Sequence, residues 1–223
     1  MNEEENLKEL LPYLLKYGGE SLAEIIVVDG GSKDNSKAVA KSNGVVVLQT
    51  SLSNRATQLN LGALNAKREV LDFLHADTRP CHDYITTILS AVSNGSEVGC
   101  FRYKFDSKNP LLKYNSWFTR FNGIFSGGGD QSLFIKKNLF NSLGGFDPSF
   151  CIMEDFELVR RIRQNSKFQV LPNEMTVSDR KYRENNWLKV QLANLIAFSL
   201  FSLKIKPATI KSLYLNLLSK KKF

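Results

Sequence analysis

Short apolar runs alternate with helix-like stretches along the first third of the chain. The runs cover residues 24–29 (EIIVVD), 45–49 (VVVLQ) and 70–75 (VLDFLH), and stretches at 34–42 and 54–67 separate them. Continuously apolar strands are buried on both faces, and strands separated by helices usually pair in parallel. The pattern therefore predicts an α/β domain with a mostly parallel sheet flanked by helices. Its ligand site is expected at the carboxyl ends of the strands.

The remaining chain contains further strand and helix patterns. Strands are predicted at 97–105, 132–135 and 168–171, and helices at 82–93, 155–164 and beyond 186. With 223 residues, of which 43% are hydrophobic, the chain is long enough for one sizeable core. We predict a single domain spanning residues 1–223.

An uncharged stretch near the C-terminus, residues 190–203 (VQLANLIAFSLFSL), allows two interpretations. A membrane-spanning helix needs about 20 predominantly apolar residues, so this stretch is too short to span. It is either a packed core helix, which we favour, or an amphipathic segment at a membrane interface around Leu195, Phe198 and Phe201.

The positive charge is concentrated at the same end of the chain. The net charge is +8, yet residues 160–223 hold 14 Lys or Arg against 3 Asp or Glu, a local net charge of +11. A solvated basic face explains this, as does contact with an anionic membrane, nucleic acid or phosphates. The scattered cysteines Cys81, Cys100 and Cys151 and an acidic N-terminus without a signal-peptide pattern predict a cytoplasmic protein.

Two acidic residues follow predicted strands directly. Asp29 precedes Gly30, Gly31 and Ser32, in a turn that favours close approach of the backbone to a ligand. A carboxylate there can bind a ribose or a base edge, or it can simply cap the next helix. Asp77 follows the string His-Ala, and one carboxylate with phosphate oxygens and water suffices for Mg²⁺ or Mn²⁺. His75 is a less natural ligand and is expected to pack behind the site.

Other chemistry-bearing residues stand at a helix start and in glycine-rich loops. Glu154 and Asp155 precede an amphipathic helix, where they either cap the helix or supply a general base. Two loops offer backbone access and sugar-binding groups. These residues are Gly129, Asp130 and Gln131 in the first loop, and Gly145 and Asp147 in the second.

Six strings in order resemble the motifs of family 2 glycosyltransferases of the GT-A fold. They are EIIVVDGGSKDNS, NRATQLNLGALNAK, VLDFLHADT, GGGDQSLFIKK, LGGFDP and MEDFELVRRIR. The resemblance covers residues 2–214. The His-Ala-Asp-Thr string is similar to that of a small bacterial branch of the family.

The resemblance implies a role for each candidate residue. Asp29, with Gly30, Gly31 and Ser32, would contact the donor nucleoside, and Asp77 would ligate Mn²⁺ or Mg²⁺ on its diphosphate. Asp155, beside Glu154, would be the general base. Phosphate binding is assigned to Arg55, Arg180 and Arg183, and acceptor binding to the loop residues Gly129, Asp130, Gln131, Gly145 and Asp147. Residues 1–100 would form the nucleotide-sugar-binding half, 101–185 the acceptor half and 186–223 a C-terminal helical segment.

The sequence departs from the family pattern at two places. His75 replaces the first acid of Asp-x-Asp, which makes metal dependence less secure. The chain also begins where the family's Pro-x-x-Asn-Glu motif would be ending, so the first strand is expected to be absent. Such a loss would leave neighbouring strands with unpaired backbone and the donor pocket open. A start placed too late or an impaired copy would each explain it.

The function predicted from the sequence is inverting, metal-assisted transfer of a sugar from a nucleoside-diphosphate sugar to an acceptor hydroxyl. A lipid-linked acceptor and peripheral contact with the inner face of an anionic membrane would account for the basic C-terminal third. A nucleotidyltransferase is disfavoured because no glycine-rich loop ends in Lys. The remaining alternatives are a truncated, inactive relative and a basic membrane- or nucleic-acid-binding protein. We expect no nucleic-acid partner, because alternating Phe101, Tyr103 and Phe105 are explained by one packed face of a strand.

Overall fold

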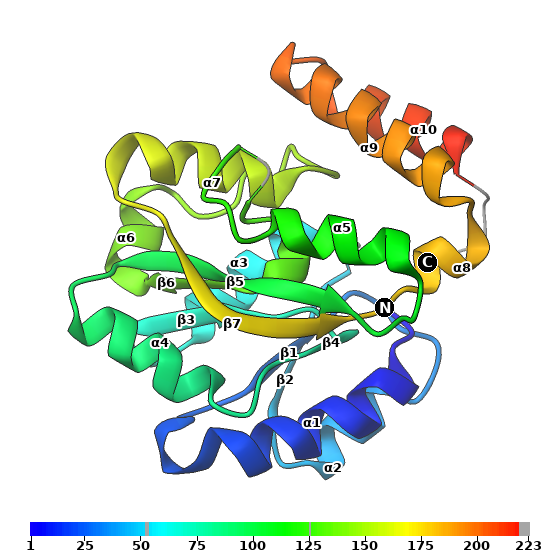
Figure 1. Ribbon diagram of the computed structural model, residues 1–223. Helices are drawn as coiled ribbons and strands as arrows, with labels where there is room; N and C mark the ends of the chain where they lie inside the picture. Colours follow the sequence, from blue (N-terminus) through cyan, green and yellow to red (C-terminus); the bar gives the residue numbers. More distant parts are fainter. Residues whose placement is uncertain (52–53, 125, 219–223) are drawn as a thin grey trace.

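The computed structural model describes residues 1–51, 54–124 and 126–218, and Figure 1 shows the arrangement of their helices and strands. The strands are β1 (Ile26–Asp29), β2 (Val46–Gln49), β3 (Val70–Phe73), β4 (Thr78–Arg79), β5 (Val98–Phe105), β6 (Leu133–Lys136) and β7 (Gln169–Val177). The helices are α1 (Glu4–Gly18), α2 (Ser36–Ser42), α3 (Arg55–Asn65), α4 (Tyr84–Ser93), α5 (Pro110–Phe118), α6 (Lys137–Ser142), α7 (Glu154–Asn165), α8 (Arg180–Glu184), α9 (Trp187–Ser202) and α10 (Pro207–Leu217), with 3₁₀ turns η1 (Gly19–Ser21) and η2 (Gly129–Gln131).

The strands form two sheets of mixed direction. β1 and β2 pair in parallel, and the second sheet has the order β3-β6-β5-β7-β4. Within this larger sheet only β5 and β7 are parallel, whereas β3–β6, β5–β6 and β4–β7 are antiparallel. The α/β prediction is confirmed, but "mostly parallel" is wrong for the larger sheet. Regular strand–helix alternation ends after β3, and the long stretch 106–132 lets the chain reverse direction between β5 and β6.

Among the described residues, β1 and β3 each pair with a neighbour on one side only. Most side chains of both strands are partly exposed. The two sheets are held together by α1, a helix that the sequence interpretation did not include. Leu7 and Leu11 pack with Val27 of β1, and Leu10 and Leu14 pack with the core on the second sheet. The absence of a first strand stays a prediction.

Helices cover both faces of the larger sheet. One core contains residues of α3, α6 and α7, including Ala63, Phe140 and Ile162. The other contains α4, with Tyr84 and Ile88. The predicted helices at 82–93, 155–164 and beyond 186 are therefore confirmed, and they support the strand ends that carry the site.

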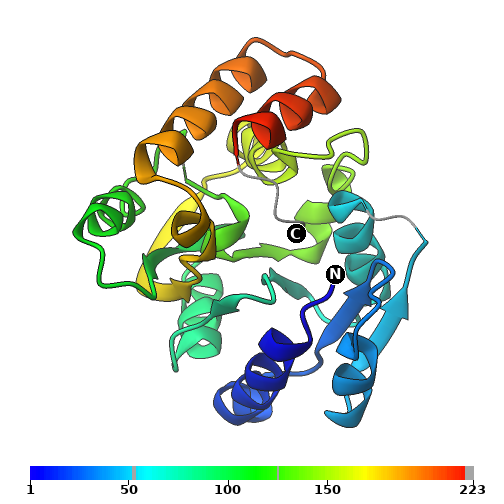
Figure 2. The ribbon, with the colours of Figure 1, turned by 90° about the vertical axis from the view of Figure 1, so that its right-hand side faces the viewer.

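The uncharged C-terminal stretch forms most of α9, which folds back against α10. Phe201 and Ala197 pack with Ile210 of α10 and with Phe156 of α7. Figure 2 shows this hairpin on the side of the molecule opposite α1 and α2. No helix within the described ranges is both long and apolar enough to cross a bilayer. Core packing, the favoured interpretation, is correct for one face of α9, and it includes Phe201, which is 7% exposed.

Candidate active site

The loop after β1 is organised by the buried carboxylate of Asp29. Its Oδ2 accepts hydrogen bonds from the backbone N–H groups of Gly31 and Ser32, both at 3.0 Å. Burial raises the pKa of Asp29, but the hydrogen bonds from Ser32 and Gly31 outweigh it, so the net shift is downward. Gly31 has a φ of +97°, which favours glycine, and a Cβ at Gly30 would collide with Gln58. Asp29 therefore holds an ionised carboxylate at the predicted nucleoside-binding edge.

The N-terminal residues close over the same loop. The N–H of Asn2 donates to Ser32 Oγ at 2.9 Å, and the N–H of Glu3 donates to Ser36 Oγ at 3.0 Å. The N–H of Lys33 donates back to Asn2 Oδ1 at 2.9 Å. The hydroxyl of Ser32 is thus engaged by the chain itself, as are the N–H groups of Gly31 and Ser32, which donate to Asp29.

Glu154 and Asp155 lie buried in the first turn of α7 and face Arg55 from α3. Arg55 Nη1 is 3.0 Å from Glu154 Oε1 and 3.1 Å from Asp155 Oδ2. The residue that precedes the helix is Met153, in the left-handed region with φ +64°, and it makes no side-chain cap bond. The acidic pair thus stays in the first turn, where the helix dipole favours its charge, while its side chains pair with Arg55.

The environment of Asp155 tunes its acidity. Burial raises its pKa to about 6, while the charge of Arg55 acts in the opposite direction and that of Glu154 adds to the rise. A backbone hydrogen bond from Gly129 also favours the carboxylate. A carboxyl with a pKa near 6 is largely ionised at neutral pH and still basic enough to accept a proton from a hydroxyl.

Gly129 is the point where three functional side chains converge. A Cβ on this residue would collide with His75 and Arg55 and would lie 2.7 Å from Asp155 Oδ2. Only a residue without a side chain fits without displacing one of them. Gly129 therefore serves the site through its small size and its N–H group.

His75 belongs to the same cluster. Its Nε2 contacts the guanidinium of Arg55, and its Nδ1 is 3.6 Å from Asp130 Oδ1. Burial and the neighbouring Arg55 charge hold the pKa of His75 well below its usual value. A neutral ring accepting at Nε2 carries its proton on Nδ1, towards Asp130. Nε2 is thus engaged by Arg55, and Nδ1 faces Asp130 at a longer distance.

A cavity of about 310 Å³ lies beside this cluster and is roofed by the C-terminal helices. Asp77 and Asp130 line it together with the cationic side chains of Arg180 and Lys181. Arg180 Nη2 is 3.6 Å from Asp77 Oδ2. The sequence interpretation missed Lys181 and the polar or aromatic residues of the roof, although the run RKYRENN signalled a basic segment. The missed lining residues are Tyr103, Phe105, Ser178, Lys181, Tyr182, Asn194, Tyr214 and Leu218.

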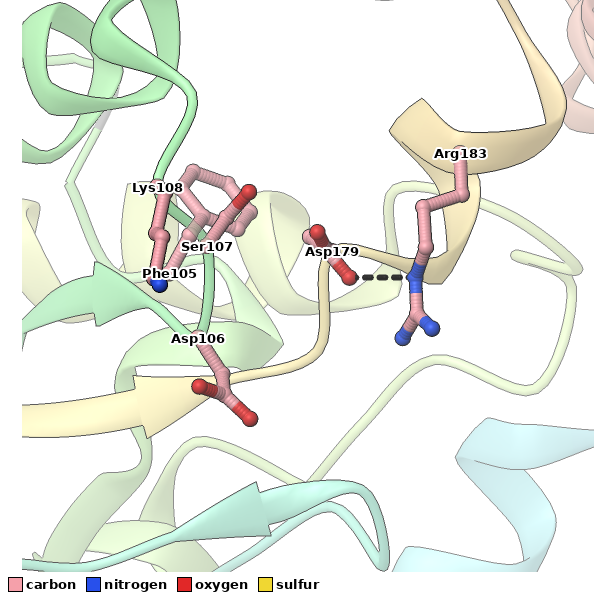
Figure 3. Close-up of a pocket in the computed structure, with 6 residues that line it drawn as sticks. All are labelled: Phe105, Asp106, Ser107, Lys108, Asp179 and Arg183. Carbon is pink, nitrogen blue, oxygen red and sulfur yellow. Dashed lines mark ion pairs between the residues drawn. The ribbon is translucent and has the colours of Figure 1, made fainter.

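Arg183 lies in a neighbouring hollow rather than in this cavity. The hollow, about 540 Å³ in volume, is lined by Phe105, Asp106, Ser107, Lys108, Asp179 and Arg183 (Figure 3). Arg183 Nε is 2.6 Å from Asp179 Oδ1, and the figure shows the rest of its guanidinium pointing away from the other lining side chains. The structure thus brings Arg180, but not Arg183, next to Asp77.

Three of the predicted acceptor-binding residues are engaged elsewhere. Gln131 is buried, where its amide donates to Phe101 O at 2.9 Å and accepts from Gly127 N at 2.7 Å. The carbonyl of Gly145 accepts from Arg161 at 2.7 Å, and Asp147 Oδ1 accepts the N–H of Ser149 at 2.8 Å. None of the three lines the cavity. Of the five predicted residues only Asp130 lines the cavity, and Gly129 precedes it in the chain. Their acceptor roles stay predictions.

The sequence profile of the family described as glycosyl transferase family 2 matches residues 1–163. The chain belongs to this family. No curated protein matches the sequence. The carboxylate cluster and the cavity are therefore the candidate active site of a family 2 glycosyltransferase.

Solved structures support the GT-A fold of this family 2 glycosyltransferase. S. aureus TarS (residues 1–349) has a TM-score of 0.68 at 15% identity, covering 97% of this chain and 67% of that one. The mannosyltransferase PcManGT from Pyrobaculum calidifontis, solved with GDP-Man and Mn²⁺, has a TM-score of 0.69 at 16% identity with the same coverage. Glucosyl-3-phosphoglycerate synthase from Mycobacterium tuberculosis, solved with Mn²⁺ and UDP, has a TM-score of 0.63 at 13% identity, covering 92% and 77%. These likenesses establish the fold.

The donor set near the cavity suits a cation that arrives with a diphosphate. Within the described ranges no group of three or more His, Cys, Asp or Glu side chains could hold a metal alone. Asp77 is partly exposed and lines the cavity with Asp130, so hard oxygen donors are present there. One or two carboxylates completed by phosphate oxygens and water match the preference of Mg²⁺ and Mn²⁺. The residues therefore fit a substrate-bridged metal.

Proposed function

We propose that this chain transfers a sugar from a nucleoside-diphosphate sugar to an acceptor hydroxyl, with inversion at the anomeric carbon. The observation that carries the proposal is the buried Asp155, held by Arg55 and placed beside a cavity lined by Asp77 and two cationic side chains. A general base and a site for an anionic leaving group are the two parts that a direct displacement requires.

Each part of the mechanism is assigned to particular residues. Asp29 and the backbone of Gly30 and Gly31 hold the nucleoside. Arg180 and Lys181 bind the diphosphate through charge-assisted hydrogen bonds, and Arg180 keeps Asp77 in place. A divalent metal held at Asp77 would supply further neutralisation of the departing diphosphate.

The acceptor side uses the carboxylate cluster. Asp155 takes the proton of the attacking hydroxyl on one carboxylate oxygen, while Arg55 and the Gly129 N–H keep that carboxylate oriented. Glu154 is the second partner of Arg55. Gly129 and Asp130 border the acceptor, because they connect the base to the cavity. Burial of Asp155 strengthens its electrostatic interactions with these neighbours.

The finer parts of the proposal concern the acceptor and its location. We place the protein in the bacterial branch that carries the His-Ala-Asp-Thr string, acting on a lipid-linked acceptor at the cytoplasmic face of a membrane. The +11 charge of residues 160–223 supports contact with an anionic surface. Free thiols at Cys81, Cys100 and Cys151 suit a reducing compartment.

A donor screen tests the proposal. The purified chain is incubated with a panel of UDP-, GDP- and dTDP-sugars, Mn²⁺ or Mg²⁺ and a lipid extract, and release of the nucleoside diphosphate is measured. We expect release with one donor class, lost in Asp155→Asn. Calorimetric titration of the matching nucleoside diphosphates shows whether the donor site forms. Absence of both release and binding across the panel would overturn the function.

A further inference from the structure

The outer face of α5 is a cluster of exposed apolar side chains. Leu112 and Thr119 are buried towards the sheet, whereas Leu111, Tyr114, Trp117, Phe118 and Phe121 face solvent. Tyr114 and Phe118 are 65% and 62% exposed. Single exposed apolar residues are ordinary, but several large ones gathered on one helix face mark an interaction surface.

Helix α9 continues the pattern with leucines. Its inner face contributes Val190 and Phe201 to packed clusters. Leu188, Leu192 and Leu195 follow one another at helical spacing on the opposite face, and each is exposed. A helix that is apolar all round is buried or faces an apolar phase. One face of α9 is buried in packed clusters, and the other exposes its leucines.

The two helices adjoin at the start of α9. Trp187, at the start of α9, donates from Nε1 to Asn115 Oδ1 of α5 at 3.2 Å. The same Asn115 donates to the hydroxyl of Tyr182, in α8, at 2.9 Å. Figures 1 and 2 both show α5 beside the beginning of α9, on the side of the sheet away from α1. The aromatic and leucine-rich faces therefore belong to neighbouring helices with a fixed relative position.

The charges around these helices are of one sign. Residues 107–129 and 185–218 contain no Asp or Glu and hold three and four Lys or Arg, respectively. The exposed Arg120 lies over the Trp117 ring, 5.2 Å from its centroid, and Lys113 and Lys189 are exposed nearby. Aromatic and leucine side chains bordered by Lys and Arg are the composition of segments that lie in an anionic bilayer interface.

We propose that the outer faces of α5 and α9, called here the α5–α9 surface, dock this protein on an anionic membrane. Trp117 and Phe118 of α5 and Leu192 and Leu195 of α9 enter the interface, and the surrounding cations contact lipid headgroups. The partner is a lipid surface because acidic residues, which a basic protein partner would need, are missing from both segments. The proposal rests on the anionic-surface contact proposed above and assigns that contact to particular side chains. Docking needs no donor, so its failure would leave the proposed sugar transfer untouched.

Flotation of the full chain with vesicles tests the docking. The vesicles are phosphatidylglycerol mixed with phosphatidylcholine, and phosphatidylcholine alone. We expect binding to the mixed vesicles that is at least tenfold tighter than to the neutral ones. Screening by salt weakens contacts between exposed charges, so raising NaCl from about 0.1 M to about 0.5 M should lower the bound fraction without abolishing it.

Matched variants locate the surface. Leu192→Glu/Leu195→Glu and Phe118→Glu should each weaken binding at least tenfold. Leu64→Glu is the control, because Leu64 is 77% exposed on α3, a different helix. Thermal melting checks that every variant remains folded. Trp117→Phe should keep binding but remove most of the blue shift of tryptophan emission that vesicles induce.

The same experiments distinguish a membrane from a second copy of the chain as the partner of the α5–α9 surface. Absence of binding to either vesicle type, or equal loss in Leu64→Glu, would overturn the proposal. Concentration-dependent dimers that Phe118→Glu abolishes, without vesicle binding, would instead make this surface a contact between two copies of the chain. Light scattering on the lipid-free protein measures that alternative.

Discussion

Arg55 Nη1 lies between two carboxylates, 3.0 Å from Glu154 Oε1 and 3.1 Å from Asp155 Oδ2, and so ties the first turn of α3 to the first turn of α7. The sequence comparison assigned Arg55 to phosphate binding. Its guanidinium instead engages the candidate base and its neighbour, and it also contacts His75. We infer that Arg55 positions Asp155 and that Arg180 and Lys181 bind the diphosphate.

Replacement of Arg55 should shift the pH dependence of transfer. Arg55 lowers the pKa of Asp155 against the effect of burial, so Arg55→Met raises that pKa above about 6. The acidic limb of the kcat profile then moves to higher pH. We expect at least a tenfold loss at pH ~7 and partial recovery at pH ~9, because the base is again ionised there. Arg55→Lys should shift the limb less.

Arg161→Met is the matched control for Arg55→Met. Arg161 pairs with Glu157 on the same helix and donates to Gly145 O, away from the base. Its loss should lower the melting temperature and leave the acidic limb where it is. A limb that fails to move in Arg55→Met, or that moves equally in Arg161→Met, would contradict the positioning role.

Asp155→Asn should abolish transfer while leaving donor affinity intact, because the base acts on the acceptor proton.

The same substitution should change the pH dependence of stability. The folded pKa of Asp155, about 6, lies above the unfolded value of about 3.9. Its ionisation in the folded state thus lowers stability progressively as pH rises from ~4 to ~6. The asparagine variant does not ionise, so its free energy of unfolding relative to the parent should rise across this window, by up to about 3 kcal/mol.

Denaturant melts at pH 4, 5, 6 and 7 measure that difference, and single-turnover assays measure transfer. Glu157→Gln, on the same helix, is the control for a general effect of removing an acid. A variant that still transfers sugar would return Asp155 to a structural role.

Asp77→Ala should remove the contribution of the metal to nucleoside-diphosphate binding. Asp77 lines the cavity with a partly exposed carboxylate, and no larger ligand cluster exists in the described part of the chain. Calorimetry with Mn²⁺ and with a chelator should therefore differ for the parent and agree for the variant. Asp147→Ala, altered outside the cavity, serves as control. Equal affinities in the parent with and without chelator would leave Arg180 and Lys181 to hold the diphosphate alone.

The sequence predicted the parts of the fold and site that depend on local pattern. Asp29 ends a strand and Asp155 begins a helix, as expected, because strand runs and the amphipathic period are visible within ten residues. The leucine spacing at 7, 10, 11 and 14 is that of an amphipathic helix, which the prediction from sequence did not include. This helix, α1, packs on both sheets.

Contacts between distant segments were beyond such reasoning. Arg55 and Asp155 are separated by 100 residues, and their contact depends on how α3 and α7 pack on the sheet. The same holds for the roof of the cavity, where residues of α8, α9 and α10 meet Asp77. The direction of β6 was missed for a related reason, because the chain reverses over the long connection 106–132, which contains α5 and η2. The motifs of the sequence located these residues, but the packing of the helices on the sheet determines which of them are in contact.

Arg180 and Arg183 should differ in their effect on nucleoside-diphosphate binding, although three positions separate them in one short helix. Arg180 lines the cavity beside Asp77, and Lys181 lines it too. Arg183 is paired with Asp179 in the adjoining hollow (Figure 3).

We expect Arg180→Ala and Lys181→Ala to weaken binding about 10- to 100-fold, since each removes a charge-assisted contact of about 1.5–3 kcal/mol. Arg183→Ala should change the affinity less than about twofold, because its exposed ion pair contributes at most about 1 kcal/mol to stability and does not reach the cavity. Calorimetry on the three variants under one salt condition decides the matter. Equal losses for Arg180→Ala and Arg183→Ala would mean that the diphosphate extends into the hollow around Phe105, and the cavity would then be only part of the donor site.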